Sequence, residues 1–383
     1  MSSFLMWLKI FNKTGLLGFI IIALQHLFIV AGETEPIYRW IQSIEDGREV
    51  IYNGSDLQNI YALKFAAYQK IKPEVIVIGN SRANSFRKNM FHPYSFYNLS
   101  RTFVGFNNAL GFLEEIEPYH KPKYIFLIIE PFQFKRNFEL TQRKFDSSLS
   151  ILPKSRLESL ITFGLEFNHK RYSELKDDNK YLGVKAKKIK RGFRSIDGSH
   201  SEGQVRHRTV ENNIKRLGRL KKKDLESLSS RELFFNFNQP LSNTTYDYAQ
   251  LLIKQANELD ITIIGVTPPY SQDIQNTLDS DPITFQLWHE FQTETNNQKL
   301  SDIFNGLYFN FSRFSSHDGQ DYEMLDLIHP SEKIIGKMLL TMLQNKTLRN
   351  AFNKIDENKT KTKIKNNPLP LYDIFSESNY KAK

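Results

Sequence analysis

Five short apolar segments stand out from an otherwise polar chain, and each has the residue types of a β-strand. They are residues 75–78 (VIVI), 95–99 (SFYNL), 124–129 (YIFLII), 261–266 (ITIIGV) and 306–311 (GLYFNF). Three of them run almost without polar alternation. Such strands are typically buried on both faces, as in a parallel sheet covered by helices. The pattern therefore predicts a buried, five-stranded parallel sheet.

Apolar residues at helical spacing lie between these strands. One stripe, just before the fourth strand, consists of Tyr248, Leu252, Ala256 and Leu259. A second stripe over residues 334–343 predicts a C-terminal helix that Ser331 can cap, and residues 106–117 form a third predicted helix. Strands that alternate with helices predict a doubly wound α/β fold.

The N-terminal residues are the most apolar part of the chain. Residues 15–32 (GLLGFIIIALQHLFIVAG) carry no formal charge and are just long enough to cross a hydrocarbon core as a helix. Lys9 and Lys13 precede this run and two glutamates follow it. Basic residues before the span place the N-terminus in the cytoplasm and the rest of the chain outside. We therefore expect a cytoplasmic stub and one transmembrane anchor within residues 1–35.

Two alternatives to an anchor stay open. A cleaved signal peptide would use Val30-Ala31-Gly32 as its small-residue cleavage site, although the apolar run is long for that. The run could also be a buried core helix, which the charge asymmetry around it disfavours. Either an anchor or a signal peptide exports the remaining domain.

The exported part divides into an α/β domain over residues 36–350 and a tail over 351–383, which we expect to be disordered because it lacks periodicity. Residues 132–240 do not fit the alternation of strands and helices, and they form a predicted insertion. Its second half contains the basic residues Lys185, Lys187, Lys188, Lys190, Arg191, Arg194, Arg216, Arg219, Lys221, Lys222 and Lys223. A solvated basic surface explains them most simply, and docking to an anionic envelope polymer or to lipid headgroups is the alternative.

Composition narrows the possible chemistry. The chain has 52 basic and 42 acidic residues, a net charge of +10, which suits an anionic partner. Nucleic acid is not expected, because the domain is predicted to lie outside the cytoplasm. The absence of cysteine excludes disulfides, thiolate zinc sites and cysteine nucleophiles. The histidines lack metal-ligand spacing and no glycine-rich phosphate loop follows a strand, so we expect neither a metal nor a cofactor.

Ser81 is the first candidate for chemistry. It lies in Ile78-Gly79-Asn80-Ser81-Arg82-Ala83, directly after the first predicted strand of the sheet. The carboxyl ends of parallel strands are where α/β sheets build their sites, and Gly79 permits a tight turn that lifts Ser81 out of the sheet. A serine after a buried strand is also a common helix cap, so this segment alone does not establish catalysis.

Asp326 and His329 are the second candidate, in a D-x-x-H segment between the last predicted strand and the last helix. At this spacing in a loop, the carboxylate can orient the imidazole, and the imidazole can take a proton from a serine. A lone histidine in a loop is more often a surface residue. The pair gains weight because both candidate segments follow predicted strands.

The order of these motifs resembles that of the SGNH hydrolase superfamily, the GDSL-type esterases and acyltransferases. The resemblance covers about residues 73–343 apart from the insertion, and its specific motifs are the serine after the first strand and the D-x-x-H segment. Gly79-Asn80-Ser81-Arg82 is similar to the G-x-S-R form of membrane-anchored envelope members. These include the alginate O-acetylation proteins and the D-alanine transfer protein of teichoic acid synthesis.

The resemblance implies a flavodoxin-like three-layer sandwich and a triad of Ser81, His329 and Asp326. It implies an extracytoplasmic acyl transferase or esterase, with O-acetyl as the expected group and a bacterial cell-envelope polysaccharide or glycolipid as substrate. The protein would be held in the cytoplasmic membrane by its single helix, with the domain on the periplasmic or outer face. A membrane acyl-donor protein would be a further partner.

The oxyanion hole is where the chain departs from this family. In the family a glycine supplies a backbone N–H to the oxyanion, and Gly105 is the best match to it. An asparagine after the third strand completes the family's oxyanion hole. Here the third strand ends Ile129-Glu130-Pro131 without that asparagine, and Asn108 or Asn107 could replace it. Loss of one oxyanion donor costs about 10²-fold or more in rate. The departure keeps two alternatives open: a catalytically inactive binding or assembly component of an envelope glycan complex, and an unrelated α/β domain in which Ser81 is a cap.

Overall fold

The computed structural model of the protein describes residues 2–33, 36–54, 59–141, 180–202, 237–366 and 374–375, together with 161, 164–165, 211–212, 214–215 and 217–218. The chain forms two compact units. The first consists of Met1–Ala67, Ser148–Ile196 and Ser201–Gly203, and the second of Tyr68–Ser147, Asp197–His200 and Gln204–Lys383. This division differs from the single domain expected over residues 36–350, because the N-terminal part of that range pairs with part of the insertion.

The second unit contains the predicted sheet. Its strands are β2 (Val75–Gly79), β3 (Phe96–Ser100), β4 (Tyr124–Ile128), β8 (Thr262–Thr267) and β9 (Tyr308–Asn310). They lie in the order β3-β2-β4-β8-β9, and every neighbouring pair is parallel. Counted along the chain, this is the order 2-1-3-4-5 of flavodoxin-like folds. The α/β fold with a five-stranded parallel sheet is confirmed.

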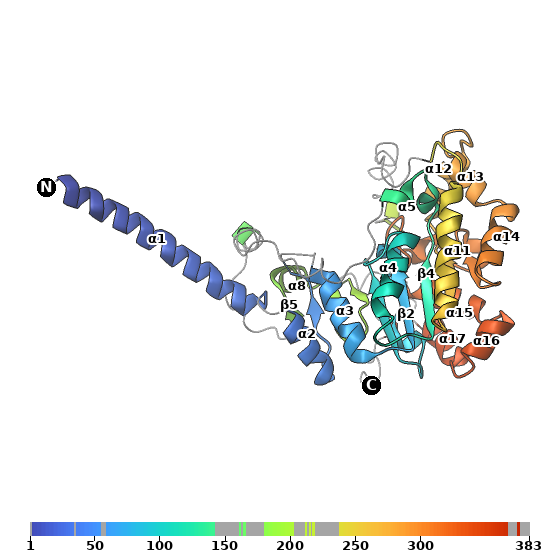
Figure 1. Ribbon diagram of the computed structural model, residues 1–383, viewed down its shortest axis with the longest axis horizontal. Coiled ribbons are helices and arrows are strands. Elements are labelled where there is room, and N and C mark those ends of the chain that lie inside the picture. Colours follow the sequence, from blue (N-terminus) through green and yellow to red (C-terminus); the bar gives the residue numbers. More distant parts are fainter. Residues whose placement is uncertain are drawn as a thin grey trace. The chain divides into compact units, whose positions relative to one another are not determined.

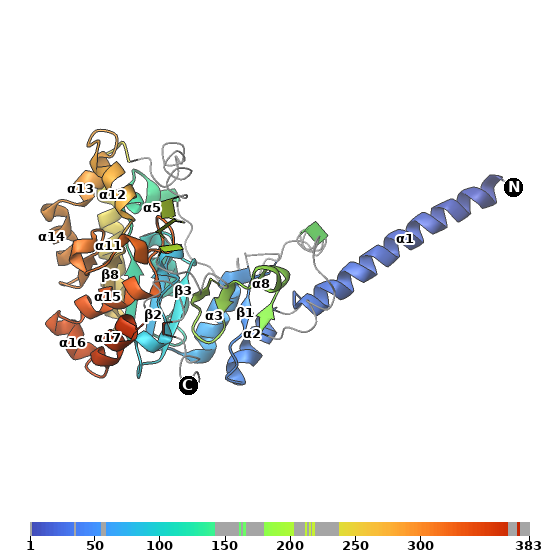
Figure 2. The same cartoon turned by 180° about the vertical axis from the view of Figure 1, so that it is seen from behind.

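Helices cover both faces of this sheet. On one face α4 (Phe106–Ile116) and α11 (Asn243–Glu258) lie side by side, as Figure 1 shows. On the other face lies α15 (Glu332–Met342), which Figure 2 shows from behind. All three helices were expected from the sequence, two of them from apolar stripes, and α4 begins at the predicted residue, Phe106.

An apolar core lies between the sheet and α15. Val77 of β2 and Ile264 of β8 are buried there with Ile334 and Met338 of α15. The predicted cap of this helix is confirmed, because Ser331 Oγ accepts a hydrogen bond from the Ile334 N–H at 3.3 Å. A helix that starts at a fixed residue also fixes the loop before it, and that loop carries His329.

Shorter elements connect these strands and helices. They are η1 (Ser81–Ala83) and η2 (Lys88–Met90) after β2, η3 (Pro131–Phe134) and α5 (Phe138–Thr141) after β4, α12 (Gln272–Asp279), α13 (Gln286–Phe291) and α14 (Glu294–Ile303) after β8, and η6 (Phe314–Ser316) and η7 (Asp321–Glu323) after β9.

The expected disorder of residues 351–383 is wrong for the part that the structure describes. α16 (Lys346–Ala351) and α17 (Glu357–Asn366) follow α15. Phe352, Ile355 and Ile364 are buried in the same core as α15. Little in the sequence marks α17, since Ile364 is its only large apolar residue. The remainder of the tail lies outside the described residues, apart from 374–375.

The first unit combines the N-terminal residues with part of the predicted insertion. Its elements are α1 (Ser2–Ala31), α2 (Pro36–Glu45), β1 (Ile51–Tyr52), β5 (Tyr181–Leu182), α8 (Val184–Ile189) and β6 (Gly192–Arg194), with α3 (Asn59–Ile71) and β7 (His200–Ser201) at its junctions along the chain. β1 pairs in parallel with β5 and antiparallel with β6. Residues 181–194 of the insertion are therefore a structural partner of the N-terminal residues.

Two of the basic residues in this insertion do not belong to a solvated surface. Lys187 is 5% exposed, and Arg194 is 1% exposed with its Nε 3.5 Å from Glu49 Oε2. For these two the expected surface position is wrong, because both side chains are buried. Residues 216, 219 and 221–223 of the basic run lie outside the described residues.

The expected N-terminal helix is present. Within the described residues, α1 belongs to the single helical segment that is long and apolar enough to cross a membrane. Its Leu17, Phe19 and Ile22 side chains are exposed. Membrane anchors and signal sequences both have such a helix, so α1 indicates membrane attachment or secretion.

Candidate active site

Ser81 begins η1, two residues after the end of β2, at the carboxyl edge of the parallel sheet. Gly79 makes this position possible. Its φ is +152°, and a Cβ there would lie 2.6 Å from the Ile128 Cβ on neighbouring β4. Asn80 then caps η1, because its Oδ1 accepts a hydrogen bond from the Arg82 N–H at 2.8 Å. Ser81 is thereby held at the start of a short, rigid turn.

The D-x-x-H segment forms a turn that is closed by its own aspartate. Asp326 Oδ1 accepts hydrogen bonds from the backbone N–H groups of Ile328 at 2.9 Å and His329 at 2.8 Å. The Leu325 N–H donates to the His329 carbonyl at 2.9 Å and closes the turn from the other side. These bonds fix the distance between the carboxylate and the imidazole before any substrate is present.

The two segments meet, although 248 residues separate them along the chain. Asp326 Oδ2 lies 2.7 Å from His329 Nδ1, and His329 Nε2 lies 2.8 Å from Ser81 Oγ. A hydroxyl, an imidazole and a carboxylate in this order form the proton-transfer line of serine hydrolases. The structure thus brings together the three residues that the sequence singled out.

Charge and exposure at the site favour an ionised aspartate. Burial alone would raise the pKa of Asp326, but the neighbouring His329 and the hydrogen bonds from His329 and Ile328 lower that pKa to about 2. The side chains of His329 and Asp326 remain 21% and 33% exposed. The carboxylate can therefore orient the imidazole at any ordinary pH, and the imidazole is open to solvent.

A buried cluster of polar side chains beneath Ser81 was not predicted from the sequence. Arg82 donates hydrogen bonds to Glu130 Oε2, to the Pro268 carbonyl at 2.6 Å and to the Ile328 carbonyl at 2.9 Å. The Tyr270 hydroxyl donates to Glu130 Oε2 at 3.0 Å. One signal was available: an arginine directly after the serine, and a glutamate directly after a buried strand that ends at the same sheet edge.

The expected oxyanion residues have other partners. Asn108 Oδ1 accepts hydrogen bonds from the backbone N–H groups of Gly105 at 3.2 Å and Val104 at 3.1 Å, and this pairing begins α4. The next two amides, of Phe106 and Asn107, donate to the Glu139 carboxylate at 3.1 and 2.8 Å. An oxyanion role for Gly105 or Asn108 stays a prediction. For Gly105 it requires the hydrogen bond from its N–H to Asn108 Oδ1 to open, whereas Asn108 would donate from its Nδ2.

Glu139 is a buried carboxylate at this helix start, with 1% of its surface exposed. Burial raises its pKa to about 7, against the opposing effect of the hydrogen bonds from Asn107 and Phe106. The carboxylate takes the place at the N-terminus of α4 that an external anion would favour.

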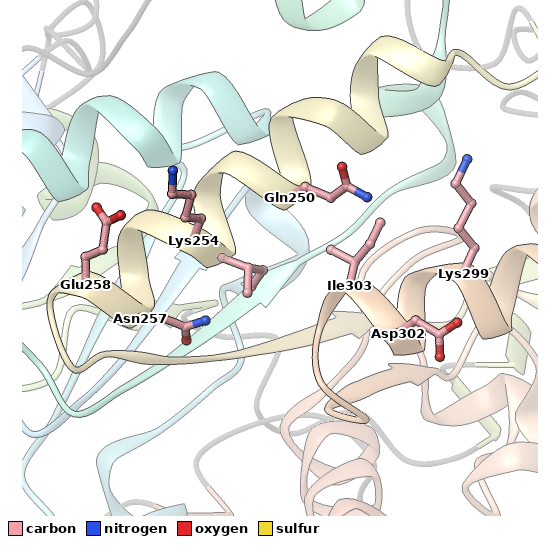
Figure 3. A pocket seen from close by; sticks show the side chains of 8 residues that line it. Gln250, Lys254, Asn257, Glu258, Lys299, Asp302 and Ile303 are labelled. Carbon is pink, nitrogen blue, oxygen red and sulfur yellow. The ribbon is translucent and has the colours of Figure 1, made fainter.

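The described residues of the second unit also form a surface groove. A groove of about 800 Å³ lies between α11 and α14, and Figure 3 shows Lys254 and Glu258 on one helix and Lys299 and Asp302 on the other. None of its lining residues belongs to the Ser81 site, and its mixed charges indicate no particular ligand. Among the residues described, no group of three or more His, Asp or Glu side chains is arranged to hold a metal ion.

Comparisons of the chain with models of known protein families, with curated proteins and with solved structures found no match. A functional assignment therefore depends on the geometry around Ser81.

Proposed function

We propose that the protein is a serine-dependent acyl transferase or esterase that acts on a bacterial cell-envelope polysaccharide or glycolipid. The observation that carries this proposal is the hydrogen-bonded line Ser81–His329–Asp326, with 2.8 Å between Ser81 Oγ and His329 Nε2. The SGNH-like order of the motifs adds the expected class of reaction and substrate, by resemblance alone.

In this mechanism Ser81 Oγ attacks the carbonyl carbon of an ester while its proton moves to His329 Nε2. The tetrahedral intermediate collapses, the ester C–O bond breaks, and the proton passes from Nε2 to the leaving alcohol. The enzyme is left acylated on Ser81. A sugar hydroxyl or water then gives its proton to His329 and takes the acyl group, and Ser81 regains its hydrogen. Asp326 stabilises the imidazolium in both halves.

The exposure of the site supports a bulky acceptor. With 21% of its side chain exposed, His329 is accessible from the surface. A sugar hydroxyl on a polymer or lipid can approach such a surface site without entering an enclosed cavity. The net charge of +10 also suits anionic envelope components.

Membrane attachment through a retained α1 is part of the proposal. Phe28 and Ala31, at the end of α1, are buried with Val184 of α8 in one apolar cluster. The Ala31 carbonyl accepts a hydrogen bond from the Gly183 N–H at 2.8 Å, and Glu33 Oε1 accepts one from the Val184 N–H at 2.7 Å. Signal-peptide cleavage after residue 32 would remove Phe28 and Ala31 from this cluster. We expect intact-mass measurement of membrane-extracted protein to find the full chain, and a mature N-terminus at residue 33 would contradict retention.

The decisive experiment for catalysis replaces Ser81. We expect Ser81→Ala to reduce turnover of an activated acetyl ester by about 10⁴-fold or more and to abolish labelling by a fluorophosphonate. Ser280→Ala is the control, because Ser280 is an exposed serine at the end of α12 and its Oγ donates to the Thr277 carbonyl at 2.8 Å. An unlabelled wild-type protein, or a Ser81→Ala variant as active as wild type, would refute the catalytic function.

A non-catalytic role as a glycan-binding or assembly component is the second candidate. It is favoured by Glu130, which stands at the end of β4 where the family has an oxyanion asparagine and is fully buried. Under this alternative Ser81→Ala would leave the cellular role of the protein intact. Loss of that role in cells that still produce the variant at normal levels would exclude it.

A further inference from the structure

We propose that Arg82 is a positioning residue that holds the His329 loop against Ser81, so that the serine–imidazole hydrogen bond exists before substrate binds. The proposal deepens the proposed function and rests on it. Arg82 is the residue next to Ser81, and its Nε donates a 2.9 Å hydrogen bond to the carbonyl of Ile328, the residue next to His329. The side chain thus ties together the two segments that carry the reacting groups.

The guanidinium reaches three separate segments at once. Besides Ile328, it donates to Glu130 Oε2 after β4 and to the Pro268 carbonyl after β8. The Cζ atom of Arg82 lies over the Tyr270 ring, 4.0 Å from the ring centre. Loops that follow three different elements are therefore joined through one rigid, planar group.

Glu130 anchors this arrangement from below. One of its oxygens accepts from Arg82 and from the Tyr270 hydroxyl, and the other accepts from Asn80 Nδ2 at 3.2 Å. Asn80 and Arg82 flank Ser81 on both sides. The glutamate that replaces the family's asparagine is thus connected to both neighbours of the serine, which gives it a role other than donating to an oxyanion.

Arg82 acts through these neighbours and does not contact substrate, because its side chain is only 4% exposed and Glu130 is 0% exposed. A lysine could not replace it. Lysine carries one ammonium group at the end of a flexible chain, whereas the three contacts use three different nitrogens of a planar fork. The Arg82→Lys variant keeps the charge next to Glu130 and loses the simultaneous link to the Ile328 carbonyl.

A buried ion pair could instead serve stability alone, and the chain offers a matched control for that possibility. Arg87 is 2% exposed and pairs with Asp197 and Glu332 at 2.9 Å each. Its two carboxylate partners lie outside the triad. Arg87→Lys therefore disturbs a buried arginine of the same kind, five residues further along the same segment.

The experiment compares wild-type protein, Arg82→Lys and Arg87→Lys in the full membrane-extracted chain. For each we would measure the melting temperature, the fluorophosphonate labelling rate, and kcat and KM for an activated acetyl ester. We expect both variants to melt below wild type. We expect kcat and labelling to fall by about 100-fold in Arg82→Lys alone, because a displacement of about 1 Å of a catalytic group costs that much, with little change in KM.

Equal losses of kcat in the two variants, or an Arg82→Lys variant that labels like wild type, would overturn the positioning role. Tyr270→Phe keeps the test decisive if Arg82→Lys does not fold, since it removes only the hydroxyl that helps to hold Glu130. We expect this variant to fold normally and to lose severalfold in kcat, and unchanged kcat would count against the proposal. An inactive wild-type protein would refute the proposed function itself, which separates the two failures.

Discussion

The triad and the expected oxyanion donors of the candidate active site differ in their hydrogen bonding. On the proton-transfer side, Ser81, His329 and Asp326 are already joined by hydrogen bonds of 2.7 and 2.8 Å. On the oxyanion side, the backbone N–H of Gly105 is bound to the Asn108 side chain. The serine is therefore already hydrogen-bonded to its base, whereas the Gly105 N–H, an expected oxyanion donor, has another partner.

This difference indicates that stabilising the oxyanion, and not proton transfer, would be the more demanding step of the reaction. Proton transfer needs only groups of the protein, and the loop that carries Asp326 and His329 fixes their spacing by its own backbone bonds. Stabilising an oxyanion needs hydrogen-bond donors that point at the position the oxyanion will occupy. Such donors have no partner before the reaction, so they do not stabilise the fold. Glu139 accepts hydrogen bonds from the two amides that follow Gly105, so these donors also have partners within the chain.

The largest effect on kcat should come from replacing Asp326, the aspartate of the triad. Asp326→Asn keeps the size of the side chain but removes the charge that holds the His329 tautomer, and we expect kcat to fall by about 10⁴-fold. Steady-state kinetics would measure this. Asp318→Asn, a change at an exposed aspartate, is the control. A loss of less than tenfold in Asp326→Asn would mean that the observed hydrogen bonds do not serve catalysis.

The same carboxylate predicts a pH dependence of stability. The pKa of Asp326 in the folded chain is lowered to about 2 from an ordinary value of 3.8. A lowered acid pKa stabilises the fold above the ordinary value, and this contribution is lost as the pH falls towards 2. Acid titration of the melting temperature should therefore show a steeper decline for wild type than for Asp326→Asn. Parallel curves would contradict the lowered pKa.

The sheet could be predicted because its signals are local. Each of the five strands is an apolar run in the sequence, and β2 and β4 begin at the predicted residues. The small sheet of the first unit could not be predicted in the same way. β1 and β5 have two residues each, too few for any periodicity, and they are defined only by pairing across more than a hundred residues.

In the candidate site, too, local motifs could be predicted and contacts between distant loops could not. Ser81, Asp326 and His329 could be predicted because each follows a predicted strand and belongs to a short motif. The contacts of Arg82 with Glu130 and the Ile328 carbonyl depend on how three distant loops meet. Residue types and spacing carry little information about such a cluster, so it emerges only from the fold.

A smaller effect, on stability, should come from Glu139, the carboxylate that binds the first amides of α4. Its pKa is raised from 4.5 to about 7, so the folded state holds a proton that the unfolded state releases. The corresponding stabilisation is complete below pH 4.5 and is lost as the pH rises to about 7. Denaturant unfolding should show this change, roughly 1–3 kcal/mol, in wild type and not in Glu139→Gln. A difference between the two proteins that is independent of pH would contradict the raised pKa.

The smallest expected effect is the one that decides what Asn108 does. Its Oδ1 accepts two backbone hydrogen bonds at the start of α4, so Asn108→Ala should cost about 1 kcal/mol of stability for each bond at most. Asn345→Ala is a matched control, because Asn345 Oδ1 caps α16 through the N–H groups of Thr347 and Leu348, away from Ser81. If Asn108 only caps, both variants lose stability and both keep kcat. If Asn108 also donates to the oxyanion through its Nδ2, only Asn108→Ala loses about 10²-fold in kcat. The first result would leave Asn108 as a helix cap, and the second would assign it to the oxyanion hole.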